Sequence, residues 1–244
     1  MVKKAVVVVN QKGGVGKTTV SFNIACAAAE MGSTLTGDGD PQGNLSLVLT
    51  QDIDIRTKKK GFEQLFGKAA FRPRSTIINN VELLHGHRGL ELLQRRSSAN
   101  QQAADLRDFV RNLPYDYLVF DTPPALGPLQ LAPIFWADVV VVPVEATFLS
   151  MSSIPEMLNT VEEARKVNPH VVVKYVINRF NSRSASEQDH LAKMQQSFGE
   201  NLMETFILSQ AVSDAVAAGI PVWENPKARK QKKQWREFCR QVLS

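Results

Sequence analysis

The glycine-rich segment after the first apolar run constrains the fold more than any other feature of the chain. Ala5–Val9 is apolar and mostly valine, which is typical of a strand buried on both faces of a parallel sheet. The residues from Asn10 to Thr19 then read NQKGGVGKTT, and a helix is predicted over Lys17–Met31, ending near Gly32. A strand, a glycine-rich turn and a helix in this order form a phosphate loop, because backbone N–H groups and the helix N-terminus converge on phosphate oxygens. We therefore predict a nucleotide site here.

Different residues of this loop are expected to contact different parts of a bound nucleoside triphosphate. We expect Lys17 to reach the outer phosphates and the Thr18 hydroxyl to complete the ligand shell of Mg²⁺. The usual pattern, GxxxxGK(S/T), lacks its first glycine because Gln11 stands there, and Lys12 follows. Since Lys17 already serves its own nucleotide, we expect Lys12 to reach the nucleotide of a second copy across a homodimer interface and to neutralise charge on the transferred phosphoryl group. The predicted nucleotide contacts of the loop are Lys12, Gly13, Gly14, Val15, Gly16, Lys17, Thr18 and Thr19.

The rest of the chain alternates short β-branched runs with longer helical stretches. Strands are predicted at 117–120, 138–143 and 171–177, and helices at 151–167 and 186–198. This order predicts an α/β fold, with a single P-loop domain over residues 1–244 and a mostly parallel, twisted sheet with helices on both faces. Such sheets bind ligands at the carboxyl ends of their strands. Residues 50–74 are polar, and we expect an irregular surface excursion there.

Composition excludes several classes of protein. Cys26 and Cys239 lie far apart with no CxxC pair, which predicts core thiols in a reducing compartment and argues against a disulfide scaffold or a zinc ribbon. No apolar run approaches the roughly 18 residues that span a bilayer, so we expect a cytoplasmic protein without a membrane partner. The formal charge of +5 permits an anionic partner. His85 and His87 have no evident third ligand, which favours a turn over a metal site.

Two segments resemble a known family. KGGVGKT resembles the deviant Walker A signature of the ParA/MinD group of P-loop ATPases, and residues 38–44, DGDPQGN, are similar to a segment of its ParA (Soj-like) partition proteins. The resemblance implies that Asp40 positions the attacking water and that Asp38 lies near Mg²⁺. A carboxylate at a strand end beside the γ-phosphate suits both tasks. The preceding residues 33–37 are polar and include Gly37, so we expect the strand there to be weak.

The resemblance continues at two further strand ends. Residues 117–124 read YLVFDTPP, and an apolar strand ending in Asp121 is the Walker B arrangement, whose carboxylate holds Mg²⁺ through its water shell. The resemblance also implies that the Asn178 amide, a donor and acceptor together, contacts the adenine, and that Pro221 lies near the base. ATP and Mg²⁺ are thus the implied ligands. The implied catalytic residues are Lys12, Lys17 and Asp40, and the implied metal-site residues are Thr18, Asp38 and Asp121.

The leading functional interpretation is a ParA-type partition or positioning ATPase with weak intrinsic hydrolysis. Its ATP-bound homodimer would bind nucleoid DNA non-specifically, and a ParB-like protein or cargo adaptor would stimulate hydrolysis. Residues 227–236 hold six basic residues and no acidic one, which suits phosphate contacts that read no sequence. No long extension precedes the phosphate loop, so an appended DNA-reading domain is not expected. The predicted DNA contacts are Lys227, Arg229, Lys230, Lys232, Lys233 and Arg236.

Two other functions stay open. A MinD-like ATPase that cycles on membranes would use a basic amphipathic helix over about residues 227–243, which can lie on anionic lipid. Packing of its apolar stripe on the domain core is the interpretation we favour. A metabolic P-loop synthetase would need a substrate pocket, for which no motif is present. An iron–sulfur role is rejected, because it needs a pair of cluster cysteines in each subunit, whereas Cys26 lies on the predicted phosphate-loop helix and Cys239 lies near the C-terminus. The residues of the stripe are Trp235, Phe238, Cys239, Val242 and Leu243.

Overall fold

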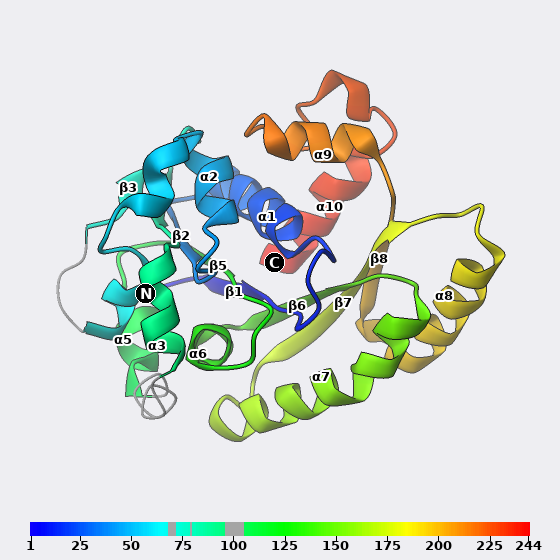
Figure 1. Cartoon of the computed structure of the whole chain (residues 1–244), viewed down its shortest axis with the longest axis horizontal. Coiled ribbons are helices and arrows are strands. Elements are labelled where there is room, and N and C mark those ends of the chain that lie inside the picture. The colour runs from blue at the N-terminus through cyan, green and yellow to red at the C-terminus, as the bar shows by residue number, and fades with distance from the viewer. Residues whose placement is uncertain (68–71, 79, 96–104) are drawn as a thin grey trace.

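The apolar runs of the sequence form the inner strands of one twisted sheet (Figure 1). The computed structural model describes residues 1–67, 72–78, 80–95 and 105–244, and these give a sheet of eight strands in the order β3-β4-β2-β5-β1-β6-β7-β8. Neighbouring strands are parallel except β3 and β4, which are antiparallel. The strands are β1 (Lys4–Val8), β2 (Thr34–Asp38), β3 (Arg74–Ser75), β4 (Val81–Leu84), β5 (Tyr117–Asp121), β6 (Val139–Val144), β7 (Val172–Phe180) and β8 (Leu202–Ile207).

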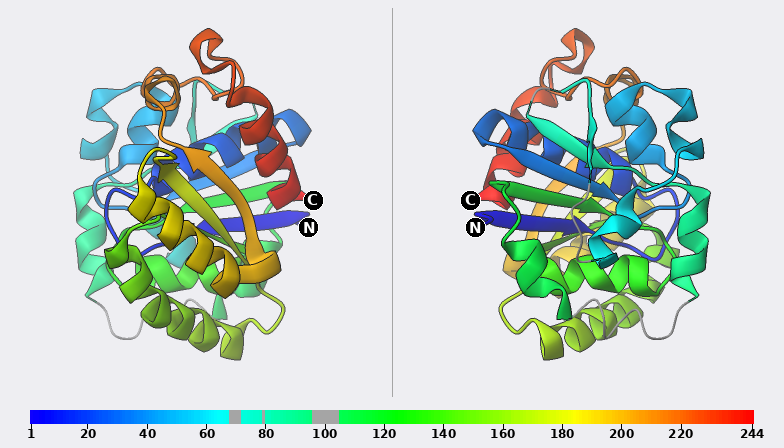
Figure 2. Two further views of the ribbon diagram at one scale, coloured as in Figure 1. Left: turned by 90° about the vertical axis from the view of Figure 1, so that its right-hand side faces the viewer. Right: turned by 90° about the vertical axis from the view of Figure 1, so that its left-hand side faces the viewer.

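Helices cover both faces of the sheet, as the views of Figure 2 show from the sides. Helices α1, α2, α9 and α10 lie on one face, and α3, α5, α6, α7 and α8 lie on the other (Figure 1). The helices are α1 (Lys17–Met31), α2 (Asn44–Thr50), α3 (Glu91–Gln94), α5 (Arg107–Arg111), α6 (Pro128–Trp136), α7 (Phe148–Val167), α8 (Ala185–Phe198), α9 (Gln210–Ala217) and α10 (Lys232–Leu243). Short 3₁₀ turns are η1 (Ile53–Thr57), η2 (Phe62–Gly67), η3 (Arg88–Leu90), η4 (Gly199–Asn201) and η5 (Pro226–Ala228).

The hydrophobic core is divided by the sheet into two layers. Alternate residues of β1 serve opposite layers, because Val7 belongs to the cluster that contains Trp136 of α6, whereas Val6 and Val8 belong to the cluster that contains Phe22 of α1. This double burial is what a valine-rich strand in a parallel sheet requires. The predicted α/β fold with helices on both faces is confirmed. Cys26 and Cys239 are both buried and free, as predicted.

The expectation of a weak strand before Asp38 is wrong. Thr34–Asp38 forms β2, which is buried along its whole length and pairs with both β4 and β5. Threonine is β-branched and suits a strand despite its hydroxyl. Gly37 is needed for packing, because a Cβ at this position would lie 2.8 Å from ring atoms of both Phe62 and Phe120. The rings of Phe62 and Phe120 therefore pack closely against the strand at Gly37.

Residues 50–74 are only partly the surface excursion that was expected. Residues 68–71 lie outside the described part of the chain. Phe62 and Leu65 of η2 are fully buried, and Phe66 is 6% exposed. The Phe62 ring meets Phe66 and Phe120 edge-on, with centroids 6.2 Å apart in both pairs. The segment is thus polar at its surface, and its buried aromatic rings pack against β2 and β5.

The C-terminal helix is shorter than predicted. It begins at Lys232, because Asn225, Pro226 and their neighbours form the turn η5, in which the Asn225 side chain accepts the Lys227 N–H. The prediction that the apolar stripe packs on the core is confirmed: its five residues are at most 3% exposed, and the Trp235 ring stacks on Phe206 with centroids 3.9 Å apart. No helix in the described parts of the chain is long and apolar enough to cross a membrane.

Candidate nucleotide site

The phosphate loop lies at the carboxyl end of β1 and is held from both sides. Gly14 and Gly16 adopt φ values of 81° and 92°, which glycine reaches without steric cost. A Cβ at Gly16 would lie 2.1 Å from Nδ2 of Asn178, so no larger residue fits there. Nδ2 of Asn10 donates to the Pro143 carbonyl at 2.7 Å, and Oδ1 of Asn10 accepts the Lys12 N–H at 2.7 Å. The loop is thus anchored to β6 and β7.

Helix α1 begins at this loop without a side-chain cap. Its N-cap is Gly16, and its first turn contains no acidic residue. The unpaired N–H groups and the partial positive charge of the helix N-terminus therefore remain available to an anion. The surrounding cavity has a volume of about 410 Å³, and its lining includes Gly13, Gly14, Gly16, Lys17, Thr18 and Thr19.

Lys17 is a buried cation at the start of this helix. Its side chain curls back, and Nζ donates to the Lys12 carbonyl at 3.0 Å. Burial lowers the pKa of Lys17, and the charges of Asp121 and Asp40 oppose this shift. No carboxylate in the described parts of the chain forms an ion pair with Lys17. A phosphate in the cavity would supply the missing negative charge.

Asp121 joins β5 to the same helix. Its Oδ2 accepts the Thr18 hydroxyl at 2.8 Å, and its Oδ1 accepts the Ser21 hydroxyl at 2.9 Å. Burial raises the pKa of Asp121 to about 6, while the two hydroxyl hydrogen bonds oppose the shift. Hydroxyl and carboxylate oxygens placed together beside a phosphate site are the donors that Mg²⁺ prefers. Thr18 and Asp121 therefore fit a magnesium ion at this position.

The two aspartates after β2 occupy different surroundings. Asp40 lines the cavity, and its Oδ1 accepts the Gln42 N–H at 2.9 Å. Burial raises the pKa of Asp40, and the Gln42 hydrogen bond and Lys17 oppose the rise. Asp38 is fully buried and does not line the cavity. Its Oδ2 accepts both the N–H and the hydroxyl of Ser46, at 2.8 and 2.6 Å, and its Oδ1 accepts the Asp40 N–H at 3.1 Å.

The second lysine of the loop points away from Lys17. Nζ of Lys12 lies 3.0 Å from Oε2 of Glu145, 3.3 Å from the Ser150 hydroxyl and 3.5 Å from the Thr147 hydroxyl. Glu145 and Thr147 belong to the connection between β6 and α7, and Ser150 lies in the first turn of α7. In the single chain, Lys12 is thus held by its own subunit, at the edge of the site and outside the lining of the cavity.

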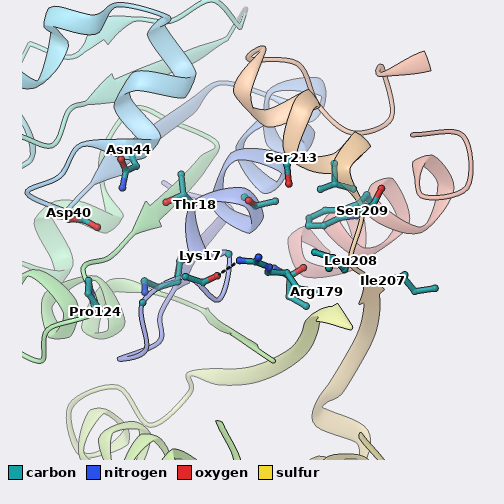
Figure 3. A pocket seen from close by; sticks show the side chains of 17 residues that line it. Lys17, Thr18, Asp40, Asn44, Pro124, Arg179, Ile207, Leu208, Ser209 and Ser213 are labelled. Carbon is teal, nitrogen blue, oxygen red and sulfur yellow. Dashed lines mark hydrogen bonds between the residues drawn. The ribbon is translucent and has the colours of Figure 1, made fainter. Parts of the chain in front are cut away.

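The far wall of the cavity comes from β7, β8 and α9. Figure 3 shows Asp40 and Asn44 on one side of Lys17 and Thr18, and Arg179, Ile207 and Leu208 on the other. Nδ2 of Asn178 donates to the Val15 carbonyl at 2.8 Å, so this predicted base contact also supports the loop. Pro221 is buried and is not part of the lining.

Arg179 is a lining residue that the sequence analysis did not single out. It has a φ of 58°, which is uncommon for a residue with a side chain, and its Nη1 donates to the Gly14 carbonyl at 3.0 Å. Its position directly after Asn178 is the only sequence signal for it. Ser209 and Ser213, and the buried ring of Trp235, complete this end of the cavity. The Trp235 indole N–H has no hydrogen-bond partner among the described residues.

The predicted DNA-contacting residues lie on η5, on the turn after it and on the start of α10. Lys232 is half-buried and the other five are exposed. One of them is already paired, because Nη2 of Arg236 lies 2.8 Å from Oε2 of Glu30 on α1. The six residues therefore do not form one uniform helix face.

His85 and His87 form no metal cluster within the described ranges. Nε2 of His85 bonds the Lys58 carbonyl, and Nε2 of His87 lies 2.9 Å from Oε2 of Glu63. Both rings therefore have local partners.

Known proteins resemble this chain in sequence and in fold. Residues 3–173 match the family model described as AAA domain. The chromosome-partitioning ATPase Soj of Thermus thermophilus is 30% identical over 208 residues, which cover 84% of this chain and 80% of that protein. Apo McdA of Cyanothece has a TM-score of 0.83 at 22% identity, covering 99% of both chains. MinD of Pyrococcus horikoshii, complexed with Mg-ADP, has a TM-score of 0.75 at 20% identity, covering 98% and 95% of the two chains. The chain belongs to the ParA/MinD family of P-loop ATPases.

Proposed function

We propose that this chain is a partition or positioning ATPase that binds ATP with Mg²⁺ in the cavity at the carboxyl end of β1. The observation that carries the proposal is the uncapped start of α1, where the buried Lys17 has no carboxylate partner among the described residues. An uncapped helix end with a buried cation favours a polyphosphate over a neutral ligand. The MinD structure complexed with Mg-ADP supports the same ligand class.

Each cavity residue has a proposed task in hydrolysis. Thr18 and Asp121 would hold Mg²⁺, which supplies charge neutralisation to the phosphates when bound. Lys17 turns from the Lys12 carbonyl to the outer phosphates, and Asp40 orients the attacking water. Asp38 acts indirectly, because it holds the Asp40 N–H and the start of α2. Asn178 and Arg179 keep the loop in place from β7.

Lys12 is proposed to act across a homodimer interface. In the single chain its ammonium group is held by Glu145, Thr147 and Ser150, so it must leave these partners to reach a second nucleotide. The Lys12→Ala variant should therefore lose stimulated hydrolysis while it retains ATP binding. Equilibrium binding of a labelled ATP analogue and ATP-turnover assays check this expectation. Normal hydrolysis by the variant would contradict a role for Lys12 in the partner's site.

The ATP-bound dimer is proposed to bind DNA without reading its sequence. Trp235 lines the cavity, and Lys232, Lys233 and Arg236 belong to the same helix, so α10 links the nucleotide site to the basic segment. Closing two copies together would raise the avidity of both basic segments for phosphates. A ParB-like protein or cargo adaptor is proposed to stimulate hydrolysis and so reopen the dimer.

Binding of random-sequence duplex DNA tests this proposal, with ATP and with ADP over a series of salt concentrations. We expect binding with ATP only, and a steep loss as salt rises, because phosphate contacts release counterions. The Lys230→Glu variant should bind more weakly than Lys193→Glu, which carries the same charge change on the distant helix α8. Equal binding with ATP and ADP, or none with either, would contradict the DNA-binding part of the proposal.

A further inference from the structure

A second groove borders the loop that carries Asp40, on the side away from the phosphate loop. Its volume is about 870 Å³, and it is lined by Pro41 and Gln42, by η1 and the turn that follows it, and by η3 with the start of α3. None of its residues lines the nucleotide cavity. The groove is therefore separate from the nucleotide cavity.

The groove is strongly cationic. Its lining contains Arg56, Lys59, Lys60 and Arg88, and none of these forms an ion pair with a carboxylate in the described parts of the chain. Glu63 is the one acidic lining residue, and it is already engaged by the His87 ring at 2.9 Å and the Gly61 N–H at 3.0 Å. An acidic ligand would meet four cations that have no carboxylate partner among the described residues.

Two aliphatic side chains flank these cations. Ile53 is 67% exposed and Leu92 is 70% exposed, although both line the groove. A nucleic-acid backbone would satisfy the cations and leave the aliphatic side chains in water. A peptide that carries both carboxylates and aliphatic residues would cover the two kinds of surface at once.

Gln42 connects the groove to Asp40 through two hydrogen bonds. The Gln42 N–H donates to Oδ1 of Asp40 at 2.9 Å, and the Gln42 carbonyl accepts Nη1 of Arg56 at 3.3 Å. The loop is closely packed here, because a Cβ at Gly43 would lie 2.7 Å from Cγ of Arg56. A ligand that draws Arg56 toward a carboxylate thus acts on the backbone that orients Asp40.

We propose that this groove is the docking surface for an acidic, aliphatic-rich segment of the protein that stimulates hydrolysis. The proposal rests on the proposed ATPase function, since its effect is exerted on Asp40. Binding of the segment would reposition Gln42 and thereby align Asp40 with the attacking water.

The test uses two labelled synthetic peptides, one alternating Glu with Leu and one alternating Lys with Leu. Fluorescence anisotropy without nucleotide should show binding of the Glu peptide only. Arg88→Glu should weaken this binding about tenfold, because like charges then face each other, and Leu92→Asn should weaken it less. Lys193→Glu serves as the matched control and should leave it unchanged. With ATP and Mg²⁺ present, the Glu peptide should raise turnover in the wild type and have little effect on Arg88→Glu.

Three results would overturn the docking proposal. They are equal binding of both peptides, unchanged binding by Arg88→Glu, and displacement of the peptide by random-sequence duplex DNA. A bound peptide that leaves an active enzyme's turnover unchanged would overturn the link to Asp40. Peptide binding by a protein that hydrolyses no ATP would support the docking surface while contradicting the ATPase function on which the link rests.

Discussion

The carboxyl ends of β2 and β5 carry aspartates at the same level of the sheet, yet these aspartates have different partners. Asp38 and Asp121 are paired in register on neighbouring strands, and both are buried. Asp121 accepts hydroxyls from Thr18 and Ser21 of α1, whereas Asp38 accepts groups from Ser46 and from the backbone of its own loop. Equal positions at a sheet edge therefore do not imply equal tasks, because the segment that follows each strand decides what its carboxylate meets.

In the proposed function, Asp121 at the end of β5 would hold the metal, and Asp40, which follows β2, would orient the water. Asp121 shares its helix partners with the phosphate loop, so it lies where Mg²⁺ would neutralise phosphate charge. Asp38 instead shapes the turn that brings Asp40 to the cavity. The proposed chemistry thus needs one aspartate from β5 and two from the end of β2, of which only Asp40 lines the cavity.

The largest effect on ATP turnover is expected from substitution of Asp40, which follows β2 and lines the cavity. Asp40→Ala should lower ATP turnover by about a thousandfold, because a positioned carboxylate that orients water is removed. ATP should still bind, and the closed dimer should persist longer. Turnover measurements with size analysis in ATP check this. Turnover within a few-fold of the wild type would show that Asp40 does not orient the water.

Substitution of Asp121, at the carboxyl end of β5, should weaken Mg²⁺ binding. Asp121→Asn keeps the shape of the side chain and removes its charge, so the Mg²⁺ dependence of ATP binding should shift about 10- to 100-fold toward higher Mg²⁺ concentration. Asp38→Asn, the matched change on the neighbouring strand, should shift it far less. An equal shift in both variants would break the distinction between the two strand ends.

The smallest effect concerns pH and stability. Burial, with a contribution from the Asp121 charge, raises the pKa of Asp38 from 3.8 to about 8. The folded, nucleotide-free chain therefore binds more protons than the unfolded chain in this range, and the Asp38 contribution to the free energy of unfolding falls as pH rises. The pKa of Asp121 is raised only to about 6, so its contribution to the free energy of unfolding falls mainly below pH 6.

Calorimetric melting of the nucleotide-free protein between about pH 6 and pH 8 separates the two groups. The wild type should lose stability over this interval, and Asp38→Asn should lose the least. Asp121→Asn should fall between them, because it removes only the Asp121 charge that contributes to the raised pKa of Asp38. If Asp38→Asn kept the full loss, another group would be responsible.

Local signals in the sequence were enough to predict much of the fold and the phosphate loop. The β1 run, the glycines and the Lys17–Met31 helix are each specified by neighbouring residues, and the structure has them at the predicted places. The strand at Thr34–Asp38 was underestimated because its pairing with β4 and β5 and its packing against Phe62 and Phe120 involve residues that are distant in sequence. Contacts between distant segments cannot be recognised from the polar residues of the strand alone.

The site was less predictable where the partners are distant. The spacing of the DGDPQGN segment does not show that Asp38 turns to Ser46 while Asp40 lines the cavity, since that depends on how α2 folds back. Arg179 gave no signal of its own, because its role depends on an unusual φ and on the path of the phosphate loop. Likewise, the partners of Lys12 come from residues beyond β6.

Steady-state ATP hydrolysis by the purified protein tests the central claim most directly, with the wild type and Lys17→Ala compared in Mg²⁺ and in EDTA. The account predicts turnover by the wild type in Mg²⁺, and loss of that turnover both in EDTA and in Lys17→Ala, because the cavity would lack the metal or its buried cation. Turnover that survives the Lys17→Ala substitution, or a wild type that neither binds nor hydrolyses ATP, would contradict it.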